Sequence, residues 1–244
     1  MRQVAEFFDH DSYFTPETRG IARAGYFGLC AFLDAQVGRA LAALDSSGQA
    51  GDTLVLLTSD HGEMLGQRAI WGKSAMYEAS AKVPLIISGP GIGEARRDHP
   101  VSLIDLAPTL CQAAGLETPF AGFSGSSLLD PPAPDRTVIS EYHDGGSPVG
   151  ITMVRWGQWK YVHYAESHPP ELFDLAADPE EKHDLAYARS EIVAEARRRM
   201  AEFLDPEEVN ARAHADQARL VGQLGGREKL LAVPQWNFTP ADSR

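Results

Sequence analysis

Residues 52–63, DTLVLLTSDHGE, place a continuous apolar run directly before a cluster of polar side chains. The run from Thr53 to Thr58 shows no alternation of polar and apolar side chains, and VPLIIS at residues 83–88 shows none either. Strands that are buried on both faces of a parallel sheet have this pattern. The two runs therefore predict strands of a parallel sheet, with the polar cluster at the carboxyl end of the first strand.

Helices are expected on both sides of these strands. Thr15 is a typical N-cap, and the proline that follows it favours the first turn of a helix. Apolar residues then recur at helical spacing as far as Leu44, before Ser46-Ser47-Gly48 ends the pattern. A further helix is expected at residues 103–110. The aromatic residues expected to make core contacts from the first helix are Tyr26, Phe27 and Phe32.

A different pattern begins after residue 130. The connector PPAP at residues 131–134 is stiff, and two alternating runs then flank Gly157-Gln158. A two-residue loop that starts with glycine between such runs indicates a β-hairpin. We therefore expect an antiparallel sheet over residues 137–175. Two helices near 190–204 and 206–224 should follow, with the last twenty residues as an extended tail.

The order of these elements predicts an α/β fold with two parts. Helix, strand, loop, strand, helix is typical of a layered α/β core. We expect residues 1–130 to form this core, and residues 131–244 to form a smaller subdomain with an antiparallel sheet, helices and a tail.

Composition limits the classes of partner. Lys and Arg number 22 against 34 Asp and Glu, a net charge of −12, which argues against nucleic acid because its binders carry a basic face. No run of about 20 apolar residues suggests a bilayer span, and the start has no apolar core of a signal peptide. We therefore expect a cytoplasmic protein with no membrane partner, and a homo-oligomer is possible.

Asp60 and His61 are the first candidates for chemistry. Ligands bind beyond the carboxyl ends of strands in open α/β sheets, where these residues are expected to lie. A carboxylate and an imidazole can supply an oxygen and a nitrogen ligand to a divalent cation. The alternative is that Asp60 caps the next helical turn and His61 is incidental, since such short matches are common by chance.

Three further residues are weaker candidates. Lys73, in WGKSAMYE at residues 71–78, can neutralise charge on a metal-bound oxyanion, although most lysines are simply solvated. We expect it within about 10 Å of Asp60, where its charge is still felt. Glu141 and His143 end the first strand of the second part and could reach a substrate across the junction between the two parts. The alternative for this pair is a solvated turn.

Several blocks, taken in order, resemble the type I sulfatases of the alkaline phosphatase superfamily, above all bacterial choline-sulfatase-like enzymes. The fold that this resemblance implies is a partial alkaline-phosphatase-like sandwich with a smaller antiparallel sheet at the carboxyl end. The blocks are DTLV–SDHG at residues 52–62, GKSAMYE at 72–78, VPLIISGPG at 83–91, DLAPTL at 105–110, AGL at 114–116, LFDLAADPE at 172–180 and DLA at 184–186.

The resemblance also implies roles for individual residues. Asp60 and His61 match the family's second pair of metal ligands, in which asparagine often stands where this chain has histidine. Lys73 matches the lysine that contacts the sulfate group. The expected cofactor is a divalent metal, calcium first, with manganese or zinc as alternatives because imidazole suits both. The expected substrate is a small sulfate ester.

One family feature does not occur in the sequence. The nucleophile motif, Cys or Ser followed by x-Pro-Ser-Arg, matches neither Cys30 nor Cys111, and the first pair of aspartate ligands should precede this chain. We therefore expect a carboxyl-terminal fragment of a sulfuric ester hydrolase. The alternatives are a phosphomonoester or phosphonate hydrolase of the same superfamily, and a folded fragment without catalytic function.

Overall fold

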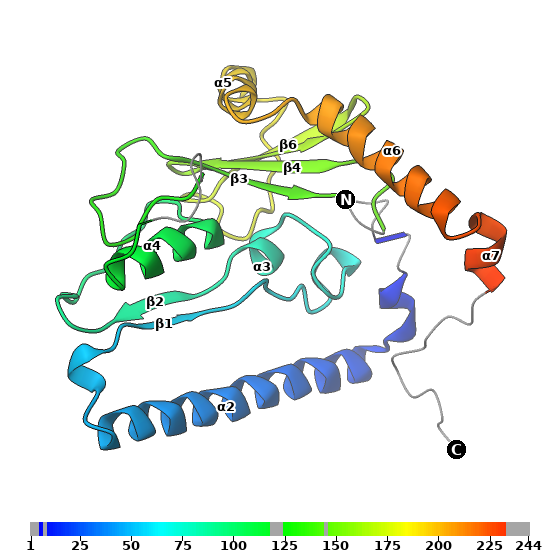
Figure 1. Ribbon diagram of the computed structural model, residues 1–244. Coiled ribbons are helices and arrows are strands. Elements are labelled where there is room, and N and C mark those ends of the chain that lie inside the picture. Colours follow the sequence, from blue (N-terminus) through cyan, green and yellow to red (C-terminus); the bar gives the residue numbers. More distant parts are fainter. Residues whose placement is uncertain (1–4, 7–8, 118–123, 144–145, 233–244) are drawn as a thin grey trace, which may run out of the picture.

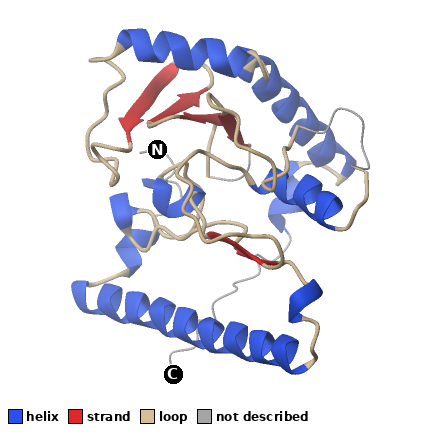
Figure 2. Ribbon diagram, turned by 90° about the vertical axis from the view of Figure 1, so that its left-hand side faces the viewer, coloured by secondary structure: helices blue, strands red, loops and turns tan. Residues whose placement is uncertain are grey.

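The computed structural model describes residues 5–6, 9–117, 124–143 and 146–232. Figure 1 shows a layered molecule, in which a long helix, a two-stranded sheet, a four-stranded sheet and an outer pair of helices follow one another. The same order of layers is visible from the side in Figure 2. The prediction of a mixed α/β fold is therefore confirmed.

The long helix is α2, Pro16–Ser46, and it begins as the sequence predicts. Thr15 and Thr18 form a reciprocal capping box, and proline occupies the first turn. The expected core contacts are wrong, however, because α2 contains no buried residue and Phe27 and Phe32 are 63% and 65% exposed. Helical periodicity indicates which residues share a face, but the burial of that face depends on what packs against it.

Two short strands follow α2. Helical turns at Ala50–Asp52 lead into β1, Val55–Thr58, and the chain returns through a loop to β2, Leu85–Ser88. The two strands pair antiparallel, with Val55 opposite Ser88 and Thr58 opposite Leu85, so the prediction of a parallel pair is wrong. Neither strand is fully buried. A continuous apolar run indicates apolar surroundings on both faces, but it contains no information about strand direction.

The loop between β1 and β2 carries the helical turns Gln67–Ala69 and the short helix α3, Glu78–Ala81. After β2, a helical turn at Leu103–Asp105 runs into α4, Leu106–Ala113, which confirms the helix expected at residues 103–110. Asp105 is buried there, where it pairs with Arg136 at 2.5 Å and accepts a hydrogen bond from the amide of Ser102.

The antiparallel sheet predicted for residues 137–175 is confirmed. Its order is β3-β4-β5-β6, with the strands at Thr137–Tyr142, Ile151–Trp156, Trp159–Tyr164 and His168–Asp174. The β4–β5 hairpin turns at Gly157-Gln158, as expected, and places Trp156 opposite Trp159. Gly157 has φ +43°, a left-handed conformation that glycine adopts without a Cβ penalty.

The two faces of this sheet bury two different clusters. One face carries Val154 and Tyr161, which pack on Val193, Ala196 and Met200 of α5, Ser190–Ala201. The other face packs on the loop between β1 and β2. The residues that the loop contributes are Met64, Ile70, Ala75, Met76 and Tyr77, and the sheet residues beneath them include Ile151, Met153, Val162 and Phe173. The two parts of the chain therefore share buried core on one side of the sheet.

The remaining helices agree with the sequence except at the end. After α5 comes α6, Pro206–Gln223, capped by the Asp205 side chain. Residues Arg227–Ala232 form α7, which corrects the expectation that the whole tail is extended. Residues 233–244 lie outside the described part of the chain. The subdomain border near residue 131 stays a prediction.

Candidate active site

The loop after β1 presents Asp60 and His61 side by side. Asp60 Oδ1 accepts a hydrogen bond of 2.9 Å from the backbone N–H of His61. This bond lowers the pKa of the Asp60 carboxyl, and the nearby His61 ring acts in the same direction. The side chain of Asp60 is 81% exposed, so its second oxygen, Oδ2, is accessible to a ligand.

The His61 ring is oriented by its own loop. Its Nδ1 lies 2.9 Å from the carbonyl oxygen of Gly62, and its Nε2 lies 3.3 Å from Asp60 Oδ2. A proton on Nδ1, donated to that carbonyl, leaves the Nε2 lone pair directed toward the side where Asp60 Oδ2 lies. A backbone partner of this kind commonly fixes the ring of a metal-binding histidine.

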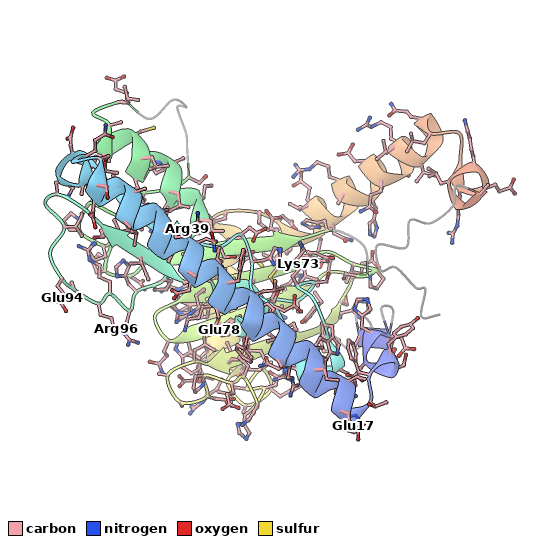
Figure 3. All side chains as sticks on the ribbon, turned by 90° about the horizontal axis from the view of Figure 1, so that it is seen from below. Glu17, Arg39, Lys73, Glu78, Glu94 and Arg96 are labelled. Carbon is pink, nitrogen blue, oxygen red and sulfur yellow. The ribbon has the colours of Figure 1, made fainter. Side chains whose placement is uncertain are left out.

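Lys73 comes from a later segment of the same β1–β2 loop, between the helical turns Gln67–Ala69 and α3, and its side chain reaches His61. Its Nζ lies 2.7 Å from His61 Nε2. Lys73 therefore lies within the distance of Asp60 expected from the sequence. Figure 3 is seen from the side of α2, and the labelled Lys73 lies farther from the viewer than this helix. The structure brings Asp60, His61 and Lys73 together, while their chemical roles stay predictions.

Two hydrogen bonds join the segments of this loop that carry His61 and Lys73. The N–H of Gly62 donates to the carbonyl oxygen of Ser80 at 2.7 Å, and the Ser80 hydroxyl donates to the carbonyl oxygen of Lys73 at 2.5 Å. Glycine is required at position 62, because an added Cβ would lie 3.0 Å from the carbonyl carbon of Ala79 and closer still to its oxygen. The spacing between His61 and Lys73 therefore depends on this close approach.

A buried ion cluster anchors the Lys73 loop to the sheet. Lys160 of β5 is fully buried, and its Nζ lies 3.0 Å from Glu78 Oε1 and 2.9 Å from Glu181 Oε1. The angles at the Lys160–Glu181 contact do not fit a hydrogen bond, so this contact is an ion pair only. The other oxygen of Glu181, Oε2, accepts a hydrogen bond of 2.7 Å from the backbone N–H of Glu78. Burial raises the pKa of the Glu181 carboxyl, and the Lys160 charge opposes that rise.

Tyr142 makes a second connection between the sheet and the segment that carries Lys73. The sequence did not indicate this contact. Its hydroxyl donates to Ser74 Oγ at 3.0 Å, directly beside Lys73. Tyr142 ends β3 on the sheet face that packs on the loop between β1 and β2. No local sequence signal distinguishes this tyrosine from an ordinary strand residue, because the contact joins positions 68 residues apart.

The structure does not bring Glu141 and His143 to this place. Glu141 pairs with Thr152 across the sheet and so occupies the face opposite to Tyr142. Its Oε1 lies 3.2 Å from His143 Nε2, and the carbonyl oxygen of His143 accepts a bond from Gln217 of α6. The two residues form a local pair beside α6, and their substrate role is an untested prediction.

The metal site is incomplete in the part of the chain that the structure describes. There, no group of three or more His, Cys, Asp and Glu residues could hold a metal ion. The donor types fit a divalent cation, because Asp60 Oδ2 lies 3.3 Å from His61 Nε2 and the Gly62 carbonyl orients the ring through Nδ1. The Lys73 ammonium lies 2.7 Å from the same Nε2, so it would have to move away from that nitrogen for a cation to bind there. Further ligands would have to come from outside these residues.

A cavity of about 480 Å³ lies elsewhere in the molecule. Glu6, Asp9, Arg68 and Tyr77 are among the residues that line it, but Asp60, His61 and Lys73 are not. The Asp60 side chain is 81% exposed and that of His61 36%, so the candidate site is open to solvent.

Comparison with protein families identifies the chain. The model named Sulfatase matches residues 5–116, and the model for the carboxyl-terminal part of N-sulphoglucosamine sulphohydrolase matches residues 66–208. Together they span the β1–β2 loop, which holds the candidate site, and the whole four-stranded sheet.

Curated relatives agree with this assignment. The chain is 36% identical to mouse arylsulfatase K over 79% of its length, and 38% identical to choline-sulfatase of Rhizobium meliloti over 70%. These matches span 37% and 34% of the two relatives, so the chain corresponds to little more than a third of either protein.

Solved structures show the same relationship. A phosphonate monoester hydrolase from Silicibacter pomeroyi matches 77% of this chain with a TM-score of 0.67 and 33% identity. A putative sulfatase from Bacteroides thetaiotaomicron matches 76% with a TM-score of 0.63 and 31% identity. The chain covers 42% of each of these structures. It therefore belongs to the sulfatase family, within the alkaline phosphatase superfamily.

Proposed function

We propose that this chain supplies the sulfate-contacting lysine and two of the metal ligands of a sulfuric ester hydrolase. The observation that carries the proposal is the convergence of Asp60, His61 and Lys73 from two segments of the β1–β2 loop, with Lys73 Nζ 2.7 Å from His61 Nε2. Family membership supports hydrolysis of sulfate esters. Because the match spans only 34% of the choline-sulfatase, the sulfate ester substrate of the whole enzyme is likewise proposed.

The roles follow from charge. Asp60 Oδ2 and His61 Nε2 would hold a divalent cation, expected to be calcium, with manganese or zinc as alternatives. Such a cation supplies Lewis-acid stabilisation of the charge that develops on an ester's oxygens. The Lys73 ammonium would bind a sulfate oxygen and oppose the same charge, while the Gly62 carbonyl keeps the His61 ring oriented.

We propose that the nucleophile lies outside this sequence. The 244 residues contain no Cys or Ser followed by x-Pro-Ser-Arg. The remaining metal ligands and the nucleophile, a formylglycine by resemblance to the family, would come from a second part of the catalytic domain.

A phosphonate or phosphomonoester hydrolase is the second candidate. It is favoured by the likeness to the phosphonate monoester hydrolase. It is also favoured by His61, which provides an imidazole nitrogen at the position where the family often has the side-chain amide of asparagine. Both candidates require the same charge stabilisation at Lys73, so geometry alone does not separate them.

Turnover by a completed enzyme tests the proposal. The segment of Rhizobium meliloti choline-sulfatase that precedes its match to this chain would be joined to the full 244 residues, in a host that forms formylglycine. Aryl sulfate, aryl phosphate and aryl phosphonate would then be compared as substrates. We expect sulfate to be preferred, and Asp60→Ala and Lys73→Ala each to lower kcat by at least about 100-fold.

Lys82→Ala provides the matched control, because Lys82 is an exposed lysine near the same loop. Its turnover should equal that of the unchanged fusion. Equal turnover in the Lys73→Ala variant would contradict the assigned role, and a preference for phosphonate would select the second candidate.

A further inference from the structure

Lys73 follows directly on a turn at Gly72. Gly72 has φ +85°, so the chain changes direction there, and Lys73 itself is exposed. The ammonium of a lysine sits on a long, flexible stem, and its average position depends on how firmly the backbone at the base of that stem is held. The contacts made at Gly72 therefore bear directly on where Lys73 Nζ lies.

Glu63 and Met64 hold the backbone of this turn. Glu63 Oε1 accepts a hydrogen bond of 2.5 Å from the N–H of Gly72, and the N–H of Met64 donates to the carbonyl oxygen of Gly72 at 2.8 Å. Met64 is fully buried, so the second bond starts from a fixed point in the core. Both peptide groups of Gly72 are therefore held, and one of them is the peptide group that leads into Lys73.

The Glu63 side chain acts on the residue before Lys73, which the other contacts at this loop do not. The Ser80 hydroxyl holds the carbonyl oxygen of Lys73 itself, and Tyr142 holds the hydroxyl of the residue that follows it. Because the acceptor at Gly72 is a carboxylate, the bond is of the charge-assisted kind, which is about twice as strong as one between neutral groups.

Glu63 also stands in the same short segment as the two proposed cation ligands. Asp60 and His61 precede it in the loop after β1. A bond from this segment to Gly72 ties the base of the Lys73 side chain to the residues whose Oδ2 and Nε2 atoms face it. Movement of one segment of the site is therefore transmitted to the other.

We propose that Glu63 is a positioning residue for Lys73. It acts through the Gly72 N–H, does not touch the ester, and keeps the Lys73 ammonium at the point that the His61 ring also reaches. The inference rests on the proposed function, in which Lys73 binds a sulfate oxygen, and adds a residue whose role depends wholly on that lysine.

The position of Lys73 in the full chain is the first test, and it requires no activity. In Glu63→Ala the Gly72 N–H loses its acceptor, so the NMR cross-peak between the Lys73 and His61 side chains should disappear. Glu63→Gln should keep the cross-peak, because its amide oxygen can accept the same bond. Glu94→Ala is the control and should also keep it, since Glu94 is exposed and lies well away from Lys73 in Figure 3.

A double-mutant cycle in the completed enzyme is the second test. The enzyme is the fusion with the Rhizobium meliloti choline-sulfatase segment, and the substrate is an aryl sulfate. Glu63→Ala should lower kcat by at least about tenfold, because a displaced ammonium opposes less of the developing charge, and Glu63→Gln should restore most of the loss. In a Lys73→Ala background, Glu63→Ala should cause no further loss, since a residue that acts through Lys73 then has nothing to position.

A second variant guards against loss of the fold. Glu63→Met keeps the length of the side chain without an oxygen, and it replaces Glu63→Ala if circular dichroism shows that the alanine variant is unfolded. Unfolding of both variants would assign Glu63 to the stability of the chain and overturn the positioning role.

The remaining outcomes also decide the proposal. It would be overturned by a missing cross-peak in the unchanged chain, by a cross-peak that survives in Glu63→Ala, or by equal loss in Glu63→Ala and Glu63→Gln. A full additional loss of kcat in the Lys73→Ala background would overturn it as well. A fusion without turnover, with the cross-peak lost in Glu63→Ala and kept in Glu63→Gln, would support the positioning of Lys73 and contradict the proposed function alone.

Discussion

Lys160 Nζ lies 3.0 Å from Glu78 Oε1, and this contact joins the four-stranded sheet to the loop that carries Lys73. The two residues are 82 positions apart in sequence. Because Lys160 is fully buried, the ion pair holds one fixed geometry that a solvated pair would not. The position of Lys73 therefore depends on a strand that contributes nothing directly to the site.

Removal of the Lys160 charge should destabilise the chain. In Lys160→Met the carboxylates of Glu78 and Glu181 lose their buried partner, and breaking one side of such a cluster costs about 3–5 kcal/mol. Urea unfolding followed by tryptophan fluorescence measures the loss. Lys182→Met is the control, since Lys182 pairs with Glu180 at the exposed surface and the substitution should leave the free energy of unfolding unchanged. A loss below about 1 kcal/mol in Lys160→Met would contradict the anchoring role.

Substitution of Gly62 should separate the two segments of the β1–β2 loop that carry His61 and Lys73. In Gly62→Ala the new methyl group would collide with the Ala79 carbonyl, and overpacking of this kind costs about 1–3 kcal/mol. The distance between Lys73 and His61 should increase, which loss of their side-chain cross-peak in an NMR spectrum would report. Gly93→Ala is the matched control because an added Cβ there meets nothing. An unchanged cross-peak in Gly62→Ala would show that the close approach does not set the geometry.

Stability should fall at alkaline pH through Tyr77 and Tyr164. Burial, together with the nearby Glu171 carboxylate, raises the pKa of both phenols. The folded state therefore keeps these protons at a pH where the unfolded chain loses them. Their stabilisation is complete below pH about 10, the unfolded pKa, and each tyrosine then removes up to about 1.4 kcal/mol per pH unit as pH rises further.

Unfolding by urea between pH 9 and 11 measures this dependence. Tyr77→Phe should make the fall with pH less steep, because phenylalanine has no proton to lose in the unfolded chain. The exposed Tyr187 supplies the control, since Tyr187→Phe should leave the slope unchanged. A slope in Tyr77→Phe as steep as that of the original chain would be inconsistent with the raised pKa.

The chain alone should hydrolyse no aryl sulfate above background. Asp60 and His61 provide two ligands, and cation affinity rises with ligand number and charge. No covalent route exists without the nucleophile. Turnover would be measured with added calcium and with added manganese, for the chain as written and for Asp60→Ala. Hydrolysis that disappears in Asp60→Ala would show that a nucleophile exists within these 244 residues.

Local chemistry in the sequence was sufficient to predict several elements. Thr15 and Pro16 predicted the start of α2, and Gly157-Gln158 predicted the β4–β5 hairpin, because capping and turn formation involve residues close together in the chain. The position of Asp60 and His61 after a strand was predicted for the same reason. Ordered blocks of residues from 52 to 186 were also enough to predict the sulfatase family.

Other properties required the tertiary structure. The antiparallel direction of β1 and β2 depends on how the chain returns between them, and an apolar run does not encode it. The exposure of Phe27 and Phe32 depends on which surfaces are available to cover α2. The contact of Lys73 with His61, and its anchors at Lys160 and Tyr142, join residues distant in sequence. Sequence patterns report a residue's own neighbours along the chain, whereas these contacts arise only when separate segments pack together.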